Sequence, residues 1–104
     1  MLDITGKRIA IVEDDAASLK YYETLLKDSG AVISVYRNGR EFVDAVTSGR
    51  ENFDLIFMDF LVPLVNGIEC TRAFRQVNKS APVILITAYY SEQTRNAVSY
   101  THLP

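Results

Sequence analysis

The sequence has few of the residues on which several common kinds of site depend. It contains one cysteine, Cys70, one histidine, His102, and no tryptophan. A single cysteine excludes an internal disulfide and favours a reducing compartment such as the cytoplasm, and so little cysteine and histidine excludes an ordinary zinc site. The motifs GxxxxGKS/T, GxGxxG, HExxH and GxSxG are absent as well. The sequence therefore gives no support for the common nucleotide, dinucleotide, zinc-protease or hydrolase sites.

Long apolar runs and a one-sided charge balance are also missing. No apolar stretch approaches the roughly 20 residues of a membrane span, and the N-terminal segment has charges on both sides of its apolar run, unlike a signal peptide. The formal net charge of −2 gives no reason to expect direct binding to nucleic acid or to an anionic membrane. With 104 residues, 48% of them hydrophobic, the chain is predicted to form a single domain over residues 1–104.

Four short apolar runs predict β-strands. Three of them, residues 9–12, 55–58 and 83–86, lack polar alternation, which is typical of parallel strands buried on both faces. The fourth, residues 32–36, carries a serine in its middle and is predicted to be an edge strand. Between these runs, apolar residues recur at helical spacing. This spacing predicts helices over about residues 16–28, 39–48 and 67–77. This alternation predicts an α/β domain with a doubly wound parallel sheet.

Acidic residues follow two of the predicted strands. Glu13, Asp14 and Asp15 come directly after the first strand, Asp59 follows the third, and Thr87 follows the fourth. In an open parallel sheet, ligands bind beyond the carboxyl ends of the strands, so we expect these side chains at one edge of the sheet. Crowded carboxylates repel unless a cation joins them, and their hard oxygen atoms suit Mg²⁺. Asp59 beside such an ion is predicted to be a nucleophile that receives a phosphoryl group.

Each of these residues also has a simpler structural interpretation. Asp14 or Asp15 could cap a helix that begins near residue 16, Asp59 could belong to a turn, and Thr87 could bond to strand-end backbone. The convergence of three separate segments on one edge favours a functional site over three unrelated structural roles. Cys70 lies on the apolar side of a predicted helix and is predicted to be a small core residue.

Three segments together resemble the receiver domain of two-component response regulators. They are RIAIVEDD, DLIFMDFLVPLVNGIE and APVILITA, in the order and spacing of the family over roughly residues 7–98. The resemblance implies a flavodoxin-like fold with strand order 2-1-3-4-5. It also implies that a histidine kinase or phosphotransfer domain donates a phosphoryl group from phosphohistidine to Asp59. Such a domain is a signalling module rather than an enzyme, although it can assist its own phosphorylation and dephosphorylation.

The resemblance also assigns a magnesium site. Asp14 matches a direct Mg²⁺ ligand, and Glu13 matches an acid that binds the ion largely through water. Asp59 and the backbone carbonyl of Leu61 match the further ligands of the family. Gly67 matches the loop that shapes the site.

Residues near the C-terminus are assigned in the same way. Thr87 matches a hydroxyl that bonds a phosphoryl oxygen and moves inward on activation, and Ala88 matches the small residue that keeps the pocket open. Tyr100 aligns with the switch aromatic of the family, and Leu103 aligns with a lysine that pairs with the phosphoryl group. About six residues upstream of this segment and the final helix of the family have no counterpart. We therefore leave the fifth strand open and expect a domain that is incomplete at its C-terminal end.

Three functions are compatible with these features. The first is a phosphoacceptor receiver, and the start ITGKRIAIVEDD, which resembles receivers fused behind histidine kinases, allows a fragment of a hybrid histidine kinase. The second is a pseudo-receiver, a protein-interaction module that does not cycle phosphate, which Leu103 in place of lysine favours. The third is an acid-phosphatase-like enzyme with an aspartyl nucleophile. That enzyme would require a DxD motif, whereas Leu61 stands two residues after Asp59. The sequence favours the first.

Overall fold

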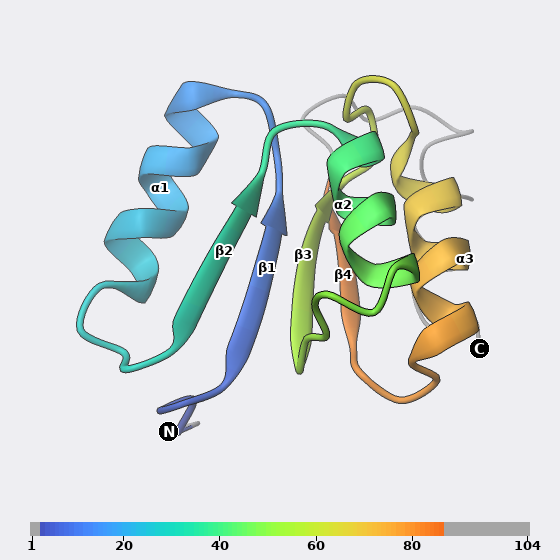
Figure 1. The fold of residues 1–104 in the computed structure, drawn as a ribbon. Helices are drawn as coiled ribbons and strands as arrows, with labels where there is room; N and C mark the ends of the chain where they lie inside the picture. Colours follow the sequence, from blue (N-terminus) through green and yellow to red (C-terminus); the bar gives the residue numbers. More distant parts are fainter. Residues whose placement is uncertain (1–2, 87–104) are drawn as a thin grey trace.

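The computed structural model describes residues 3–86 (Figure 1), so the predictions for Thr87, Ala88, Tyr100, Leu103 and the fifth strand lie outside the described residues. Within residues 3–86, strands and helices alternate along the chain as predicted. The elements are β1 (Arg8–Val12), α1 (Ala16–Leu26), β2 (Val32–Tyr36), α2 (Gly39–Thr47), β3 (Leu55–Asp59), α3 (Gly67–Val77) and β4 (Val83–Ile86). None of these helices is both long and apolar enough to cross a membrane.

The end of α1 differs slightly from the prediction. The helix was expected to run to about residue 28, but it ends at Leu26. Lys27 leaves the helical conformation with a ψ of 136°, and Asp28 has a φ of 63°. The N–H of Ser29 then donates to the carbonyl of Leu26, at 3.1 Å. A turn with Lys27 and Asp28 at its centre therefore ends the helix. The sequence had placed this end slightly later, at the Ser29-Gly30 pair.

The four described strands form one parallel sheet with the order β2-β1-β3-β4. This confirms the flavodoxin-like order for the described strands and places β2 at an edge, as predicted. Val12 of β1 pairs with Met58 of β3, and Asp59 pairs with Ile86 of β4. Because this register aligns the ends of β1 and β3, the residue after Val12 comes beside Asp59. The sheet itself thus brings two acidic segments together.

Helices cover both faces of the sheet. The helices α2 and α3 pack on one face and α1 packs on the other (Figure 1). Successive side chains of a strand point to opposite faces, so Ala10 and Val12 of β1 join the core under α2 and α3, whereas Ile9 and Ile11 join the core under α1. The first core is the larger one and contains Cys70, which is fully buried, as predicted.

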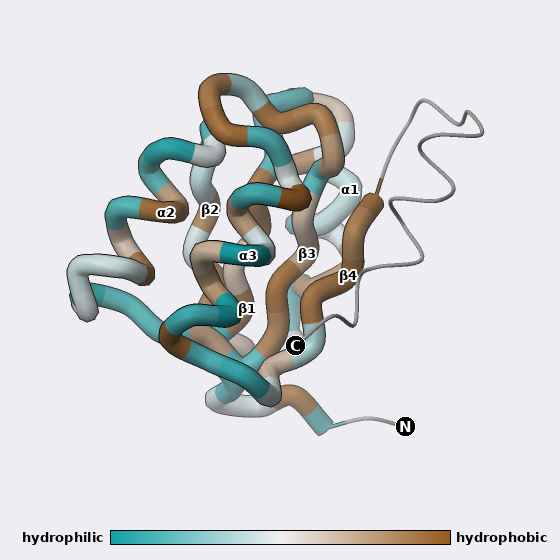
Figure 2. The backbone as a smooth tube through the Cα atoms, turned by 90° about the vertical axis from the view of Figure 1, so that its right-hand side faces the viewer, coloured by the Kyte–Doolittle hydropathy of each residue, from teal (hydrophilic) through white to brown (hydrophobic). Residues whose placement is uncertain are grey.

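The prediction of strands buried on both faces is right for β1 but wrong for β3 and β4. On the α1 side of the sheet, Leu55 and Phe57 are only half-buried, and Ile84 is 41% exposed. Among the described residues, α1 is the one helix on this face, and its buried contacts centre on β1. Figure 2 shows β3 and β4 as strongly hydrophobic strands. Their apolar sequence therefore exceeds the burial that α1 supplies on this side.

Leu64 in the loop between β3 and α3 has an unfavourable backbone conformation. Its φ is 74°, and the N–H of Val65 donates to the carbonyl of Pro63 at 2.9 Å, which closes a γ-turn around Leu64. Positive φ costs an ordinary L-residue roughly 1–2 kcal/mol, and such γ-turns are strained. The Leu64 side chain is 78% exposed, so it recovers little of this cost by packing.

Replacing Leu64 with asparagine is therefore expected to stabilise the domain by about 1 kcal/mol, because asparagine tolerates positive φ better than leucine. Urea denaturation followed by circular dichroism measures this difference. The matched control is Leu25→Asn, since Leu25 is 57% exposed but lies in α1 with helical geometry. A loss of stability in Leu64→Asn would show that the leucine side chain makes a stabilising contact.

Candidate functional site

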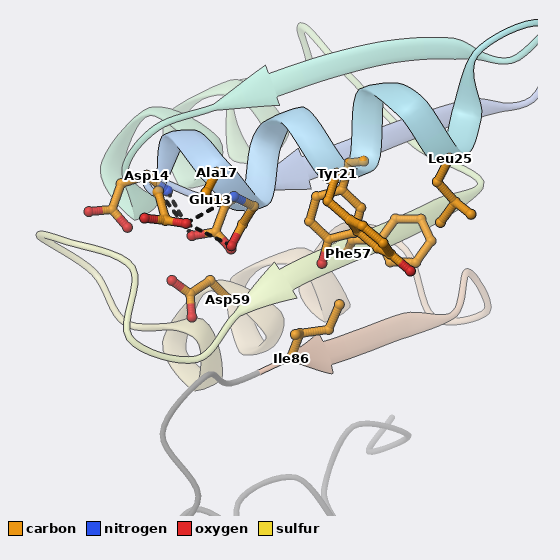
Figure 3. Close-up of a pocket in the computed structure, with 11 residues that line it drawn as sticks. Glu13, Asp14, Ala17, Tyr21, Leu25, Phe57, Asp59 and Ile86 are labelled. Carbon is orange, nitrogen blue, oxygen red and sulfur yellow. Dashed lines mark hydrogen bonds between the residues drawn. The ribbon is translucent and has the colours of Figure 1, made fainter.

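Three carboxylates from two segments meet at the carboxyl edge of the sheet. Glu13 and Asp14 lie between β1 and α1, Asp59 is the last residue of β3, and each offers an oxygen within 4.8 Å of the others. Figure 3 shows them at one end of a cleft. Glu13 is only 7% exposed, Asp59 is half-buried and Asp14 is exposed. The structure therefore brings together the three acids that the sequence placed at this edge.

Hydrogen bonds hold the loop that carries Glu13 and Asp14. The N–H of Glu13 donates to the carbonyl of Tyr36 at 2.9 Å, which ties the loop to the end of β2. The Glu13 carboxylate then accepts the N–H groups of Asp14 and Asp15, both at 3.1 Å (Figure 3). These bonds fold the loop around the Glu13 carboxylate, and they fix the direction in which the Asp14 side chain leaves the backbone.

Asp14 and Asp15 have different roles, although the sequence allowed either one to cap α1. Asp15 is the N-cap. Its carboxylate accepts hydrogen bonds from the N–H and from the hydroxyl group of Ser18, both at 2.9 Å. This accounts for Asp15 as a structural residue. Asp14 takes no part in the cap, and its carboxylate belongs to the acidic cluster instead.

Asp59 is fixed by the loop that follows it. The N–H of Leu61 donates to Asp59 Oδ1 at 3.2 Å, and the N–H of Gly67 donates to the carbonyl of Phe60 at 3.0 Å. The N–H of Phe60 in turn donates to the carbonyl of Ile86 at 2.8 Å. Both the side chain and the backbone around Asp59 are therefore held by neighbouring segments, with Leu61 directly beside the carboxylate.

The acids perturb one another. The pKa of the Glu13 carboxyl is raised from 4.5 to about 7, chiefly by burial and also by the negative charges of Asp59 and Asp14, while the hydrogen bond from the Asp15 N–H opposes the rise. Three close carboxylate oxygens with unrelieved repulsion are a donor set that suits a hard divalent cation such as Mg²⁺. The residues present therefore fit the ion that the family implies.

The rest of the cleft is apolar. The whole cleft, acids included, has a volume of about 710 Å³. Its wall beyond the acids includes Tyr21 and Leu25 of α1, Phe57 of β3 and Ile86 of β4 (Figure 3). Tyr22 also lines the cleft, and its ring is 5.3 Å from that of Phe57. Burial raises the pKa of the Tyr22 phenol to about 12, and the charges of Glu13 and Asp59 contribute.

Sequence analysis missed one residue at this edge. Arg37, which follows β2, donates from Nη2 to the carbonyl of Asp14 at 3.0 Å. No sequence pattern indicates this contact, because the two residues are 23 positions apart and Arg37 belongs to no recognisable motif.

The shifted pKa of Glu13 predicts a pH-dependent stability in the absence of metal. Between the ordinary value of 4.5 and about 7, the folded protein holds a proton that the unfolded chain has released. Stability should therefore be greatest below pH 4.5, fall as the pH rises to about 7 and then level off for this group. Thermal unfolding in EDTA at several pH values, compared with Glu13→Gln, isolates the effect. Parallel curves for the two proteins would contradict the prediction.

Comparisons with known proteins place this arrangement in a family. The family model of the response regulator receiver domain matches residues 9–101. Hybrid signal transduction histidine kinase B of Dictyostelium discoideum is 42% identical over 74 residues, which are 71% of this chain and 4% of that protein. Transcriptional regulatory protein PcoR of Escherichia coli is 32% identical over 82 residues, which are 79% of this chain and 35% of that protein. The chain thus spans well under half of either relative.

Solved structures give the same result. The receiver domain of sensor histidine kinase PA1611 from Pseudomonas aeruginosa, with a magnesium ion in its active site cleft, matches with a TM-score of 0.79 and 25% identity over 93% of this chain and 80% of that one. The receiver domain of histidine kinase CKI1 from Arabidopsis thaliana, in complex with Mg²⁺ and BeF₃⁻, has a TM-score of 0.77 and 27% identity over 94% of this chain and 77% of that one. With its fold, its acidic edge and these matches in agreement, the chain belongs to the response regulator receiver domain family.

Proposed function

We propose that this chain is a phosphoacceptor that takes a phosphoryl group from phosphohistidine onto Asp59. The observation that carries the proposal is the position of the Asp59 carboxylate at the end of β3, where its oxygen lies within 4.8 Å of those of Glu13 and Asp14. Asp14, Asp59 and the backbone carbonyl of Leu61 would hold Mg²⁺ directly, with Glu13 acting largely through water. When bound, the ion would neutralise charge on the phosphoryl oxygens.

Asp59 supplies the nucleophile in this proposal. One carboxylate oxygen forms a bond to phosphorus while the P–N bond to the imidazole of the donor breaks, and the electron pair of that bond returns to the imidazole nitrogen. We assign the attack to Oδ2, because Oδ1 accepts the N–H of Leu61. The same hydrogen bond orients the carboxylate before the donor arrives, so that little reorganisation is needed during transfer.

The remaining roles are proposed from the family. Thr87 would bond a phosphoryl oxygen, Ala88 would keep the pocket open, and Tyr100 would respond as the switch aromatic. The donor would be a histidine kinase or a phosphotransfer domain, and the likeness to a hybrid histidine kinase makes a receiver segment of such a kinase one form of this proposal. Because phosphohistidine is made from ATP, we also propose a cytoplasmic setting.

The pseudo-receiver remains a second candidate, because Leu103 stands where the family has a lysine that pairs with the phosphoryl group. The two candidates differ in one respect that can be measured. A phosphoacceptor forms an acyl phosphate on Asp59, whereas a pseudo-receiver keeps the fold and its partner surfaces without forming one.

Incubation with acetyl phosphate and Mg²⁺, followed by intact-protein mass spectrometry, tests the proposal. We expect the mass of one phosphoryl group to be added to the wild-type chain and to Asp44→Asn, in which an exposed aspartate of α2 is changed. We expect none on Asp59→Asn. Equal labelling of Asp59→Asn would refute the assignment, and an unlabelled wild-type chain that still binds Mg²⁺ would favour the pseudo-receiver.

A further inference from the structure

The two peptide groups on either side of Asp14 are held by three hydrogen bonds. The N–H of Asp14 and the N–H of Asp15 both donate to Glu13 Oε2, at 3.1 Å each. The carbonyl of Asp14 accepts from Arg37 Nη2 at 3.0 Å. The peptide that joins Asp14 to Asp15 is therefore held at both its oxygen and its N–H. Because a peptide group is planar, this fixes the direction in which the backbone presents the Asp14 carboxylate.

The three bonds differ in what they require of the acidic cluster. Two of them use the carboxylate of Glu13, which is itself one of the clustered acids. A cation that draws on the Glu13 oxygens competes with those two bonds. The bond from Arg37 uses a backbone carbonyl and comes from outside the loop, next to the end of β2. Arg37 is therefore the restraint on Asp14 that does not compete with a bound ion.

We propose that Arg37 is a positioning residue for the metal site, and that it acts by holding the carbonyl of Asp14. This inference rests on the proposed function, because it assumes that Asp14 binds a divalent cation. Arg37 would touch neither the metal nor the phosphoryl group. It would limit the motion of the loop, so that less order has to be gained when the cation binds.

A purely electrostatic role for Arg37 has the opposite consequence for metal affinity. A guanidinium group close to a cation site repels the cation, so its removal should strengthen Mg²⁺ binding, and more so at low salt. If Arg37 positions Asp14, its removal should weaken Mg²⁺ binding despite the lost repulsion. The sign of the change in affinity therefore distinguishes the two roles.

Calorimetric titration of the full chain with Mg²⁺ measures this sign. We expect Arg37→Met to bind Mg²⁺ roughly tenfold more weakly than wild type, which is the lower range for loss of an outer partner of a metal ligand. Arg37→Lys keeps the charge and one donor, and we expect its affinity to lie between the two. Arg72→Met, which removes an exposed arginine of α3 on the other face of the sheet, is the matched control and should bind like wild type.

Amide hydrogen exchange gives a second readout that needs no metal. If Arg37 holds the Asp14–Asp15 peptide, the Asp15 amide should exchange faster in Arg37→Met than in wild type and in Arg72→Met. Equal or tighter Mg²⁺ binding by Arg37→Met, or unchanged exchange at Asp15, would overturn the inference about Arg37. The proposed function would still stand if the wild-type chain binds Mg²⁺ and is labelled at Asp59. A wild-type chain that binds no Mg²⁺ would overturn the inference and the proposed function together.

Discussion

Gly67→Ala is expected to destabilise the domain by about 3 kcal/mol, at the upper end of the usual cost of overpacking. A Cβ at Gly67 would lie 2.6 Å from the carbonyl oxygen of Asp59 and 3.0 Å from the Cα of Phe60. Both are backbone atoms, so no change of side-chain rotamer can relieve the contact. The start of α3 would have to move away from the end of β3, and the hydrogen bond from the Gly67 N–H to the Phe60 carbonyl would lengthen.

Chemical denaturation measures this effect, and Gly49→Ala is a useful contrast. A Cβ at Gly49 meets nothing within 4 Å, so the cost there comes from its φ of +81° alone and should be roughly 1–2 kcal/mol. Because Gly67 lies against the backbone of Asp59, the proposed phosphoacceptor, its replacement should also weaken Mg²⁺ binding, whereas Gly49→Ala should not. If Gly67→Ala costs no more than Gly49→Ala, α3 can shift without disturbing β3.

Asp14→Asn is expected to have the largest effect on the proposed metal site. Loss of a direct ligand should reduce Mg²⁺ affinity by roughly 100-fold or more, beyond the usual cost of losing an outer partner. Without metal, the same change should stabilise the fold, because it removes one of the charges that raise the pKa of Glu13. Weaker metal binding together with greater metal-free stability is typical of a functional site in which repulsion between carboxylates is retained because the carboxylates bind the metal.

Calorimetry with Mg²⁺ and thermal unfolding in EDTA measure the two changes. Asp44→Asn, on an exposed position of α2, makes the same chemical change away from the cluster and should alter neither quantity. Unchanged Mg²⁺ affinity in Asp14→Asn would remove this residue from the site. A loss of metal-free stability would show that Asp14 supports the loop rather than straining it.

The sequence predicted the elements and the acidic edge because both depend on local patterns. Uninterrupted apolar runs identified the strands, helical spacing identified α1, α2 and α3, and the parallel arrangement then implied that Glu13 and Asp59 lie at one edge. The register of Val12 with Met58 completes that argument by setting the two acidic segments side by side. Little more than periodicity and strand direction was needed.

What the sequence could not predict depends on contacts between distant segments. It could not assign the helix cap to Asp15 rather than Asp14, since the two neighbouring residues are both aspartates and either can cap a helix. It could not find Arg37, whose partner is a backbone carbonyl that carries no sequence signal. It also overestimated the burial of Ile84, because an apolar run indicates what a strand can bury but not which helix covers it.

Transfer from a phosphotransfer domain that carries radiolabelled phosphohistidine tests the central claim most directly. With Mg²⁺ present, the account predicts that label leaves the donor and appears on Asp59 as an alkali-labile acyl phosphate. EDTA should block the transfer, and Asp59→Asn should accept no label. Label that passes to Asp59→Asn as readily as to the wild-type chain, or that reaches a residue other than Asp59, would contradict the account.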